Sequence, residues 1–524
     1  MLAVSLAAMA LPAAVAAFPG DLDPSFGTYG KQRGGFLPGS GSQPVSGNDV
    51  VVQSGGPIVV AGSGFQPHFG QFGMLLGYGA DGQFGTGGFG FARGPGTWSL
   101  ESVVELADGS LLAAGLPVGG GPRIVLVRIL RDGSPDASFG GDGAADVQFA
   151  SAGIDDVDLA LGPARKIVVA AASPNGLLIA RTLSDGSPDP TFAGGGSTVL
   201  AVGATETASI ATLPGGEVIA AGTVRGGVRH AVVAKVDATG ARDPGFSGDG
   251  IAELPGASTA LDLALDDQRR AVVAGSSGAD APAAFRLLAN GEADRGFGNE
   301  GHVLGRGTGS FNGGAVQPDG KLVFVGAEFT ISRFTERGAR DSGFGRRGIA
   351  RTSMGADFSP ATATAVALQP DGKIIAAGLI TSYTSRTTSY SVAIARYLVE
   401  KGVRDADADG VPDKRDRCRY EPNAKRKGCP IVRREVTLHR SPSGFVGKVL
   451  AFPGACVERS RVVLKLAGPG RDRTVASKRV VRGSGRYSVR VGHPNGRYYA
   501  IVRPRVVLGL FLCVRDRSPR VSAP

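Results

Sequence analysis

The chain has 524 residues, and its hydrophobic content of 42% excludes wholesale disorder. A chain of this length is too long for one ordinary core unless the core is built by repetition. Glycine supplies 83 residues, far above the usual share of about 7%, and the net charge is +11. After the N-terminus no stretch reaches 18 consecutive apolar residues, so no membrane span is expected.

Residues 1–17 have the pattern of a secretory signal. An apolar run from Leu2 to Leu11 is followed by the small residues Ala16 and Ala17, where cleavage is expected. No Lys or Arg lies close to Met1, and an ordinary buried segment is the alternative. The signal pattern predicts a secreted or cell-surface protein.

A short signature, Asp-x-x-Phe, usually followed by Gly, returns about every 53 residues between residues 20 and 402. We expect its Asp to cap a turn through a side-chain oxygen and its Phe to pack between neighbouring sheets. The seven copies place their aromatic rings at Phe26, Phe84, Phe139, Phe192, Phe246, Phe297 and Phe344.

Each unit also contains an apolar run that follows a turn. The last unit shows it best, with Gln369-Pro370-Asp371-Gly372-Lys373 before the run Ile374–Gly378. Pro-Asp-Gly is typical of a tight hairpin, and a wholly apolar run indicates a strand that is covered on both faces. The equivalent runs are Ile58–Gly62, Leu111–Gly115, Ile167–Ala171, Val218–Gly222, Ala271–Gly275 and Leu322–Gly326. Each unit therefore supplies about four strands, and such a sheet cannot bury both faces alone.

The two motifs together resemble the delta-60 repeat family, whose members are expected to form β-propellers. The resemblance covers residues 20–402 and implies little about function. Seven complete units predict an all-β fold that begins with a closed seven-bladed β-propeller. An open β-solenoid is the main alternative.

Residues 403–430 contain an acidic loop with the spacing of a calcium site. Counted from Asp405, carboxylates stand at positions 1, 3, 5, 9 and 12, Gly410 at position 6 and the Val411 carbonyl at position 7. Closely spaced oxygen donors suit Ca²⁺. The stretch resembles a thrombospondin type 3 repeat, which also continues to Cys418 and to a motif like Gly428-Cys429-Pro430. By that resemblance the carboxylate ligands are Asp405, Asp407, Asp409, Asp413 and Asp416, while a merely solvated acidic linker is the alternative.

The four cysteines all lie in the last quarter of the chain. An even number in an exported protein favours two disulfides, although four cysteines allow three pairings. We expect Cys418 to pair with Cys429 and Cys456 with Cys513. Zinc is the less favoured alternative, because there is no Cys-x-x-Cys pair and no His close by in sequence.

Residues 431–524 are predicted to form a basic β-sandwich of immunoglobulin-like or transthyretin-like type. Short strands are expected at 435–440, 445–452, 462–466, 474–481, 487–491 and 498–502. Residues 414–524 hold 27 Lys or Arg and 6 Asp or Glu, a net charge of +21, whereas residues 1–413 carry −10. This asymmetry favours an anionic partner such as a cell-surface polymer or glycan, and no motif for specific nucleic-acid recognition accompanies it. A solvated surface rich in Arg is the alternative.

The sequence contains no recognised catalytic motif. The preferred hypothesis is an exported, non-enzymatic, calcium-binding surface or matrix protein with a role in adhesion. Its propeller would be a platform for a ligand or another surface protein, and its basic domain would bind an anionic surface. The alternative is a carbohydrate-active hydrolase or lyase with its site in the central funnel of the propeller, where converging carboxylates would favour catalysis.

Overall fold

The computed structural model describes two compact units, one within residues 18–399 and one within 431–523. Within these ranges the structure leaves out residues 35–42, 55, 67–69, 80–88, 91–97, 118–120, 150–152, 279, 355–359, 384–387, 433–434, 451–459, 469–471, 482–483, 485, 493–494, 504, 508–510 and 514–515.

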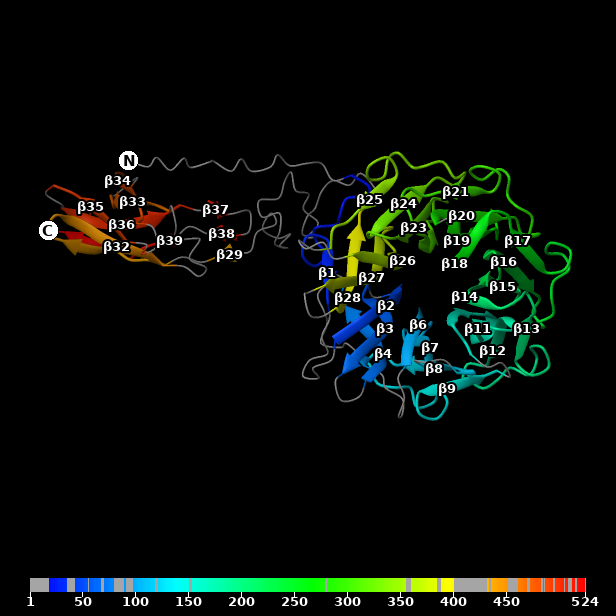
Figure 1. The fold of residues 1–524 in the computed structure, drawn as a ribbon. Coiled ribbons are helices and arrows are strands. Elements are labelled where there is room, and N and C mark those ends of the chain that lie inside the picture. Colours follow the sequence, from blue (N-terminus) through cyan, green and yellow to red (C-terminus); the bar gives the residue numbers. More distant parts are fainter. Residues whose placement is uncertain are drawn as a thin grey trace. The chain divides into compact units, whose positions relative to one another are not determined.

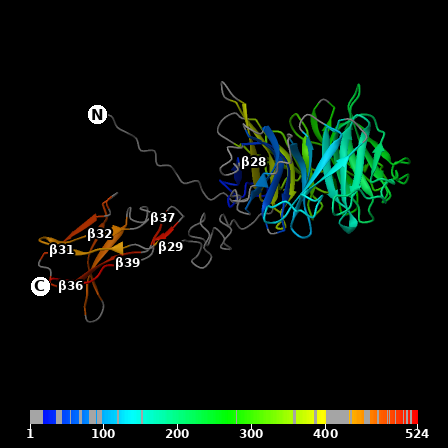
Figure 2. The ribbon, with the colours of Figure 1, turned by 90° about the horizontal axis from the view of Figure 1, so that it is seen from below.

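The first unit is built almost entirely from β-strands, which form seven four-stranded antiparallel sheets in its described part. Figure 1 shows these sheets arranged around a common axis, and Figure 2 shows the unit after a turn of 90°. From first to fourth strand, the sheets are β2 (Gln43–Val52), β3 (Ile58–Gln66), β4 (Gly70–Tyr78) and β5 (Phe89–Gly90); β6 (Trp98–Glu105), β7 (Leu111–Pro117), β8 (Arg123–Ile129) and β9 (Ala144–Gln148); β10 (Asp156–Leu161), β11 (Ile167–Ser173), β12 (Gly176–Thr182) and β13 (Ser197–Leu200); β14 (Thr205–Thr212), β15 (Val218–Val224), β16 (His230–Val236) and β17 (Ile251–Leu254); β18 (Ala257–Leu265), β19 (Ala271–Ser277), β20 (Ala281–Leu287) and β21 (His302–Leu304); β22 (Phe311–Val316), β23 (Leu322–Gly326), β24 (Thr330–Phe334) and β25 (Ile349–Arg351); and β26 (Ala361–Leu368), β27 (Ile374–Tyr383), β28 (Thr388–Tyr397) and β1 (Lys31–Arg33).

The two ends of this unit meet in one sheet. β1 comes from the start of the chain and pairs antiparallel with β28, so it completes the sheet formed by β26 to β28. β2 of the next sheet packs against the same strands. The first and last sheets are therefore neighbours, although more than 300 residues separate them along the chain.

The apolar runs predicted from the sequence are confirmed as the second strand of each sheet. The glycine that ends most of these runs has a steric cause. At Gly275 a Cβ atom would lie 1.9 Å from the carbonyl oxygen of Thr259, because the first strand bulges toward it. The run in the third sheet ends in Ala171 instead of Gly, and there β10 pairs with β11 without a bulge. Glycine at this position thus permits the bulge.

The Asp-x-x-Phe signature forms a buried cluster, as its fourth copy along the chain shows. Asp189 caps a turn by accepting a hydrogen bond from Thr191 N (3.0 Å), and Phe192 is completely buried. The guanidinium of Arg181 binds the other Asp189 oxygen (2.7 Å) and lies 4.6 Å from the centre of the Phe192 ring. Arg181 also donates to the Ala238 carbonyl of the following repeat (2.7 Å). The capping and packing roles predicted for Asp and Phe are confirmed.

The same Asp-to-cation contact occurs in all six copies whose Asp is described, and it also joins the chain ends. Asp23 of the first signature binds Arg396 of the last repeat at 2.9 Å, and this Arg stacks on Phe26. The degraded copy at Phe84 lies outside the described residues. The other pairs are Arg128 with Asp136, Arg181 with Asp189, Lys235 with Asp243, Arg286 with Asp294 and Arg333 with Asp341.

The second unit consists of two sheets around one core and a small third sheet. Phe445 and Tyr498 come from the two larger sheets, and their ring centres are 4.7 Å apart in a shared hydrophobic cluster. All six strands predicted here overlap observed strands. The sheets contain β30 (Glu435–Val436), β31 (His439–Ser441), β32 (Gly444–Leu450) and β35 (Arg486–Arg490); β33 (Arg461–Leu466), β34 (Arg473–Arg479), β36 (Gly496–Val502), β39 (Asp516–Arg517) and β40 (Val521–Ala523); and β29 (Ile431–Val432), β37 (Arg505–Val507) and β38 (Phe511–Cys513).

The buried cation–carboxylate contacts make a testable prediction at Arg286, whose side chain is only 3% exposed. Replacing Arg286 by Met keeps most of the volume but leaves the Asp294 carboxylate with only the more distant Arg270 (3.5 Å) as a charged partner. We expect this change to lower the free energy of unfolding by about 3 kcal/mol, measured by urea denaturation. Arg295→Met is the control, because that side chain is 84% exposed and its removal should change stability by less than about 0.5 kcal/mol. Equal effects of the two changes would contradict the prediction.

Candidate functional site

The first strands of all seven sheets meet around one pocket on the axis of the first unit. These strands contact one another in succession, and β2 contacts both β6 and β26. The pocket has a volume of about 220 Å³. Its polar lining residues are Asn48, Asp49, Glu101, Asp156, Asp158, Ser209, Asp262, Asn312 and Thr364.

β-Bulges turn several of these residues toward the axis. In five sheets the first strand skips one residue beside the glycine that ends the apolar run of the second strand, and the skipped residue lines the pocket. A bulge redirects a side chain that regular alternation would place elsewhere. The five skipped residues are Asn48, Glu101, Leu261, Asn312 and Thr364.

A series of hydrogen bonds joins each sheet to the next around the pocket. The carboxylates act as acceptors for backbone N–H and hydroxyl groups of the neighbouring sheet, and the last bond returns to the first sheet. In order, the bonds run from Val103 N to Asp49 (2.8 Å), Ser102 Oγ to Asp158 (2.7 Å), Ser209 Oγ to Asp158 (2.9 Å), Leu263 N to Ser209 Oγ (3.0 Å), Gly314 N to Asp262 (2.6 Å), Asn312 Nδ2 to the Ala363 carbonyl (2.9 Å) and Thr364 Oγ1 to the Gly47 carbonyl (2.5 Å).

The pocket concentrates acidic groups, and no Lys, Arg or His is among its lining residues. Burial, together with the nearby Asp158 carboxylate, raises the pKa of Asp49 to about 7 and that of Asp262 to about 6. Burial raises the pKa of Asp156 to about 7 as well, with Glu101 and Asp158 adding to the effect. Backbone N–H donors act in the opposite direction at each site. These carboxyl groups can hold a proton near neutral pH.

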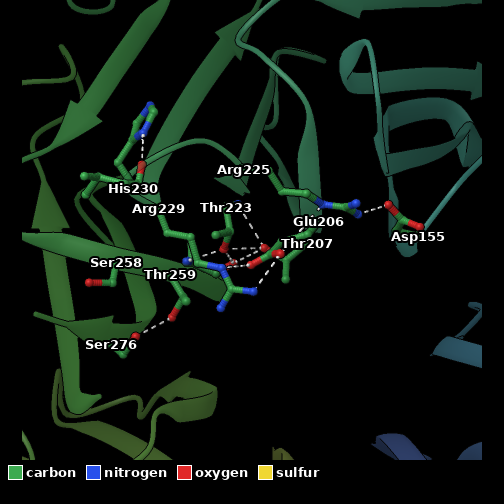
Figure 3. A network of polar contacts seen from close by, with 12 residues as sticks. Asp155, Glu206, Thr207, Thr223, Arg225, Arg229, His230, Ser258, Thr259 and Ser276 are labelled. Atoms are coloured by element: carbon green, nitrogen blue, oxygen red, sulfur yellow. Dashed lines mark hydrogen bonds and ion pairs between the residues drawn. The ribbon is translucent and has the colours of Figure 1, made fainter. Parts of the chain in front are cut away.

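A second polar network lies at the edges of the third and fourth sheets (Figure 3). Glu206, the residue skipped by the bulge near the start of β14, binds Arg229 Nε at 3.0 Å. Arg225 lies 3.7 Å from the same carboxylate and also pairs with Asp155, which directly precedes β10. The Arg229 side chain is 60% exposed, so these ion pairs contribute little to stability.

Beneath these charges, four hydroxyl groups continue the network toward the fifth sheet. Thr207 Oγ1 donates to the Ala260 carbonyl (2.6 Å) and lies 2.7 Å from Thr223 Oγ1, while Thr259 and Ser276 share a bond of 2.8 Å. His230 lies beside this network in Figure 3, but its ring nitrogen is 3.5 Å from the Val228 carbonyl, too far for a firm bond. The network connects sheets and contains no His–carboxylate pair among the residues drawn.

The predicted calcium ligands Asp405, Asp407, Asp409, Val411, Asp413 and Asp416 lie outside the described residues, as does the signal segment 1–17. Cys418, Cys429 and Cys456 lie outside them too, and only the backbone of Cys513 is described. Calcium binding, export and the two disulfides therefore stay predictions. In the part of the chain that is described, no group of three or more Asp, Glu, His or Cys is arranged to hold a metal ion.

Sequence reasoning missed the basic partner of the signature, although a simple signal marks it. A Lys or Arg stands eight residues before Asp136, Asp189, Asp243, Asp294 and Asp341. The first signature has no such residue before it, and Arg396 has no signature after it. That complementary pair could have predicted the contact between the two chain ends.

The fold and the family comparison agree on a propeller-type repeat protein. The model of a beta-propeller domain of unknown function, DUF5122, matches residues 106–139, 165–192 and 369–399. The first two matches each end on the signature Phe, at Phe139 and Phe192. No curated protein matches this chain. No helix in the described part of the chain is long and apolar enough to cross a membrane.

Solved structures resemble this chain only distantly. A protein of unknown function from Dyadobacter fermentans DSM 18053 is 10% identical, with 70% of this chain and 100% of that chain covered and a TM-score of 0.36. An ulvan lyase of family PL25 is 12% identical, with coverages of 74% and 96% and a TM-score of 0.40. A GH43 β-1,3-galactosidase is 9% identical, with coverages of 68% and 92% and a TM-score of 0.29. Similarity at this level does not indicate what this chain binds or whether it catalyses a reaction.

The axial carboxylates predict how stability depends on pH. Because the folded state raises the pKa of Asp49 and Asp156 from 3.8 to about 7, it binds more protons than the unfolded state between these values. Stability should therefore fall as pH rises from about 4 to about 7 and level off above that. Below pH 4 it should also fall, because hydrogen bonding from Ser138 lowers the pKa of Asp136, which then loses its partners on protonation.

Calorimetric melting temperatures of the full chain between pH 4.5 and 8 measure this slope. Asp49→Asn should make this slope shallower, whatever the change in absolute stability, because the amide does not titrate while Asp156 still contributes. Asp267→Asn, at an exposed position, should leave the slope unchanged. A melting temperature that rises steadily with pH would contradict the prediction.

Proposed function

We propose that this protein is an exported, non-catalytic surface protein that binds an anionic polymer through its basic C-terminal unit. In this proposal the first unit is a closed seven-bladed propeller of the delta-60 type that presents an interaction platform. A calcium-ordered linker joins it to a C-terminal β-sandwich. The observation that carries the proposal is the placement of like charges in the C-terminal sheets.

Two pairs of cations stand directly opposite each other across neighbouring strands. Arg461 of β33 is in register with Arg479 of β34, and Lys448 of β32 is in register with Arg486 of β35. All four side chains are exposed, and in the described residues none of them forms an ion pair. Like charges in this position repel and destabilise a sheet. A polyanion that neutralises both members of a pair would remove this cost and gain affinity from it.

The seven sheets and the contact between the first and last of them support the closed propeller. The shared core of the two larger C-terminal sheets supports the sandwich, because two sheets that bury one common set of side chains are the defining feature of that architecture. The calcium linker rests on the spacing of its five carboxylates in the sequence.

A carbohydrate-active enzyme is the second candidate, because carboxyl groups with raised pKa values converge on the axis. Asp156 argues against this role, since each of its oxygens already accepts a backbone N–H, from Val157 and from Ala208, both at 3.0 Å. Its carboxylate is used to join sheets, whereas a general acid must reach a substrate. Release of reducing ends from a polysaccharide, abolished in Glu101→Gln, would favour the enzyme.

Binding of the full chain to dextran sulfate, with neutral dextran for comparison, tests the proposed function. We expect binding to dextran sulfate only, with an affinity that falls as salt rises. Arg461→Gln/Arg479→Gln should lower the slope of log affinity against log salt by about 1 for each cation that no longer pairs with a sulfate group. The same double change should leave folding stability equal or raise it by about 0.2–1 kcal/mol, because a repulsive pair is removed.

Arg295→Gln/Arg346→Gln removes two exposed charges from the first unit and is the matched control. It should leave both the affinity and the salt slope unchanged. Equal binding to the neutral polymer, or equally weakened binding in both double variants, would overturn the proposal.

Calcium titration of the full chain by calorimetry tests the linker. Saturable binding is expected with a dissociation constant of about 10⁻⁴–10⁻³ M, the range of extracellular calcium modules. Asp407→Ala/Asp409→Ala should abolish it, since two of five carboxylates are removed, whereas Asp267→Ala should not. If no heat is released at millimolar calcium, the calcium site is contradicted and the loop is a solvated acidic linker.

A further inference from the structure

A second cavity lies between the fifth and sixth sheets. It has a volume of about 240 Å³. Its walls come from the loop before β22, the turn between β23 and β24, Pro282 of the fifth sheet and Arg351 at the end of β25. None of its lining residues belongs to the axial pocket.

The cavity exists because the sixth sheet has a shortened central hairpin. β23 and β24 have five residues each, whereas the neighbouring β19 and β20 have seven. Two missing residues in a strand shorten it by roughly 7 Å. The space that this hairpin would fill beside the fifth sheet is therefore left open.

The turn of this hairpin is held toward the seventh sheet. Phe329 donates its N–H to the Ala361 carbonyl (3.2 Å), and its side chain is completely buried in the cluster that contains Ile380. Glu328 and Phe329 both have positive φ, at 57° and 47°, which is a costly backbone conformation for these residue types. The strained turn is thus fixed away from the fifth sheet, and the cavity is preformed.

Guanidinium groups gather at this cavity. Arg306 and Arg351 line it, and Arg351 Nη2 lies beside Gly307, 3.8 Å from where a Cβ of that residue would stand. Arg351 pairs with Glu328 at 3.1 Å. Arg306 has no ion pair or hydrogen bond from its side chain within the described residues, so its charge is uncompensated.

A third guanidinium stands close to Arg306. Arg340 donates one Nη2 hydrogen bond to the Leu304 carbonyl (2.8 Å), two residues before Arg306. Its Nη1 is buried and has no partner in the described structure. Burial and the charge of Arg306 lower the pKa of Arg340, which places the two cations within electrostatic reach of each other. Three arginines against one Glu328 give this region an excess of positive charge, in a part of the chain that is otherwise net negative.

The remaining lining residues combine four hydroxyl groups with apolar and glycine residues. Thr308, Ser310, Thr330 and Ser332 line the cavity together with Phe311. Hydroxyls beside cations suit a ligand that has both an anionic group and several hydroxyls, because guanidinium groups bind oxyanions strongly and hydroxyls can pair with a polyol. A cavity of this size matches one monosaccharide unit.

We propose that this cavity binds a single acidic sugar residue, with its anionic group on Arg306 and Arg351 and its hydroxyls on the Thr and Ser side chains. The site is independent of the basic C-terminal unit and of the axial pocket. A carboxylate, as in a uronic acid, and a phosphate ester share this chemistry, so both are tested. The site would give the propeller a ligand of its own.

Calorimetric titration of the full chain with methyl β-D-glucuronide, glucose 6-phosphate and methyl β-D-glucoside tests the proposal. We expect saturable binding of at least one charged sugar at about millimolar concentration and none of the neutral glucoside. The charged sugar that binds more tightly identifies the anionic group. Arg306→Gln and Arg351→Gln should each weaken binding at least about tenfold, the effect of removing one charge-assisted hydrogen bond.

Arg295→Gln, an exposed change in the same region, is the matched control and should bind like the wild type. Thr330→Phe fills the cavity without changing its charge and should also abolish binding, with folding checked by the melting temperature. The proposal is overturned if no charged sugar binds at about 10 mM, if the neutral glucoside binds equally well, or if Arg306→Gln binds like the control.

Discussion

Each four-stranded sheet of the first unit must cover both of its faces with neighbouring sheets, and the rest of this unit follows from that requirement. The contact that meets it is the cluster of Asp, Phe and a cation, which occurs in the six copies of the signature that the structure describes. In this cluster Phe192 fills the gap between sheets, and Arg181 joins its own Asp189 to a carbonyl of the next repeat. At Arg181, Arg286 and Arg333 the contact reaches forward to a carbonyl of the next repeat. The cation of the last repeat, Arg396, finds its acidic partner in Asp23 at the start of the chain.

The same requirement explains what lies at the axis. Seven first strands converge there, and each needs hydrogen-bond partners that its own sheet cannot provide. Asp49, Asp158 and Asp262 supply them by accepting N–H and hydroxyl groups from the neighbouring sheet. Converging carboxylates alone would favour catalysis, but their oxygens are already committed to these bonds. This use of the carboxyl groups is why we favour a binding protein over an enzyme, and their burial at these sheet boundaries is why their pKa values are raised.

The two places where ligands are proposed are those where the structure departs from the arrangement that favours folding stability. In the sixth sheet a shortened hairpin leaves a cavity beside Arg306 and Arg351. In the C-terminal unit, Arg461 opposite Arg479 has no benefit for the sheet itself. Features that cost folding stability without a compensating contact point to a partner outside the chain.

The sequence was sufficient to predict the repeat, the second strand of each sheet and the roles of Asp and Phe in the signature. These depend on local patterns: an apolar run such as Ile374–Gly378 and a turn former such as Gly372 act within a few residues. The sequence also contained a basic residue eight positions before most of these Asp residues, a pattern that marks the basic partner of the signature. Which residues face the axis depends on the tertiary structure, because bulges at Asn48 and Glu101 break the strand alternation that sequence reasoning relies on. It alone brought Arg306 beside Arg351, since residues 45 positions apart meet only when a short hairpin leaves room between two sheets.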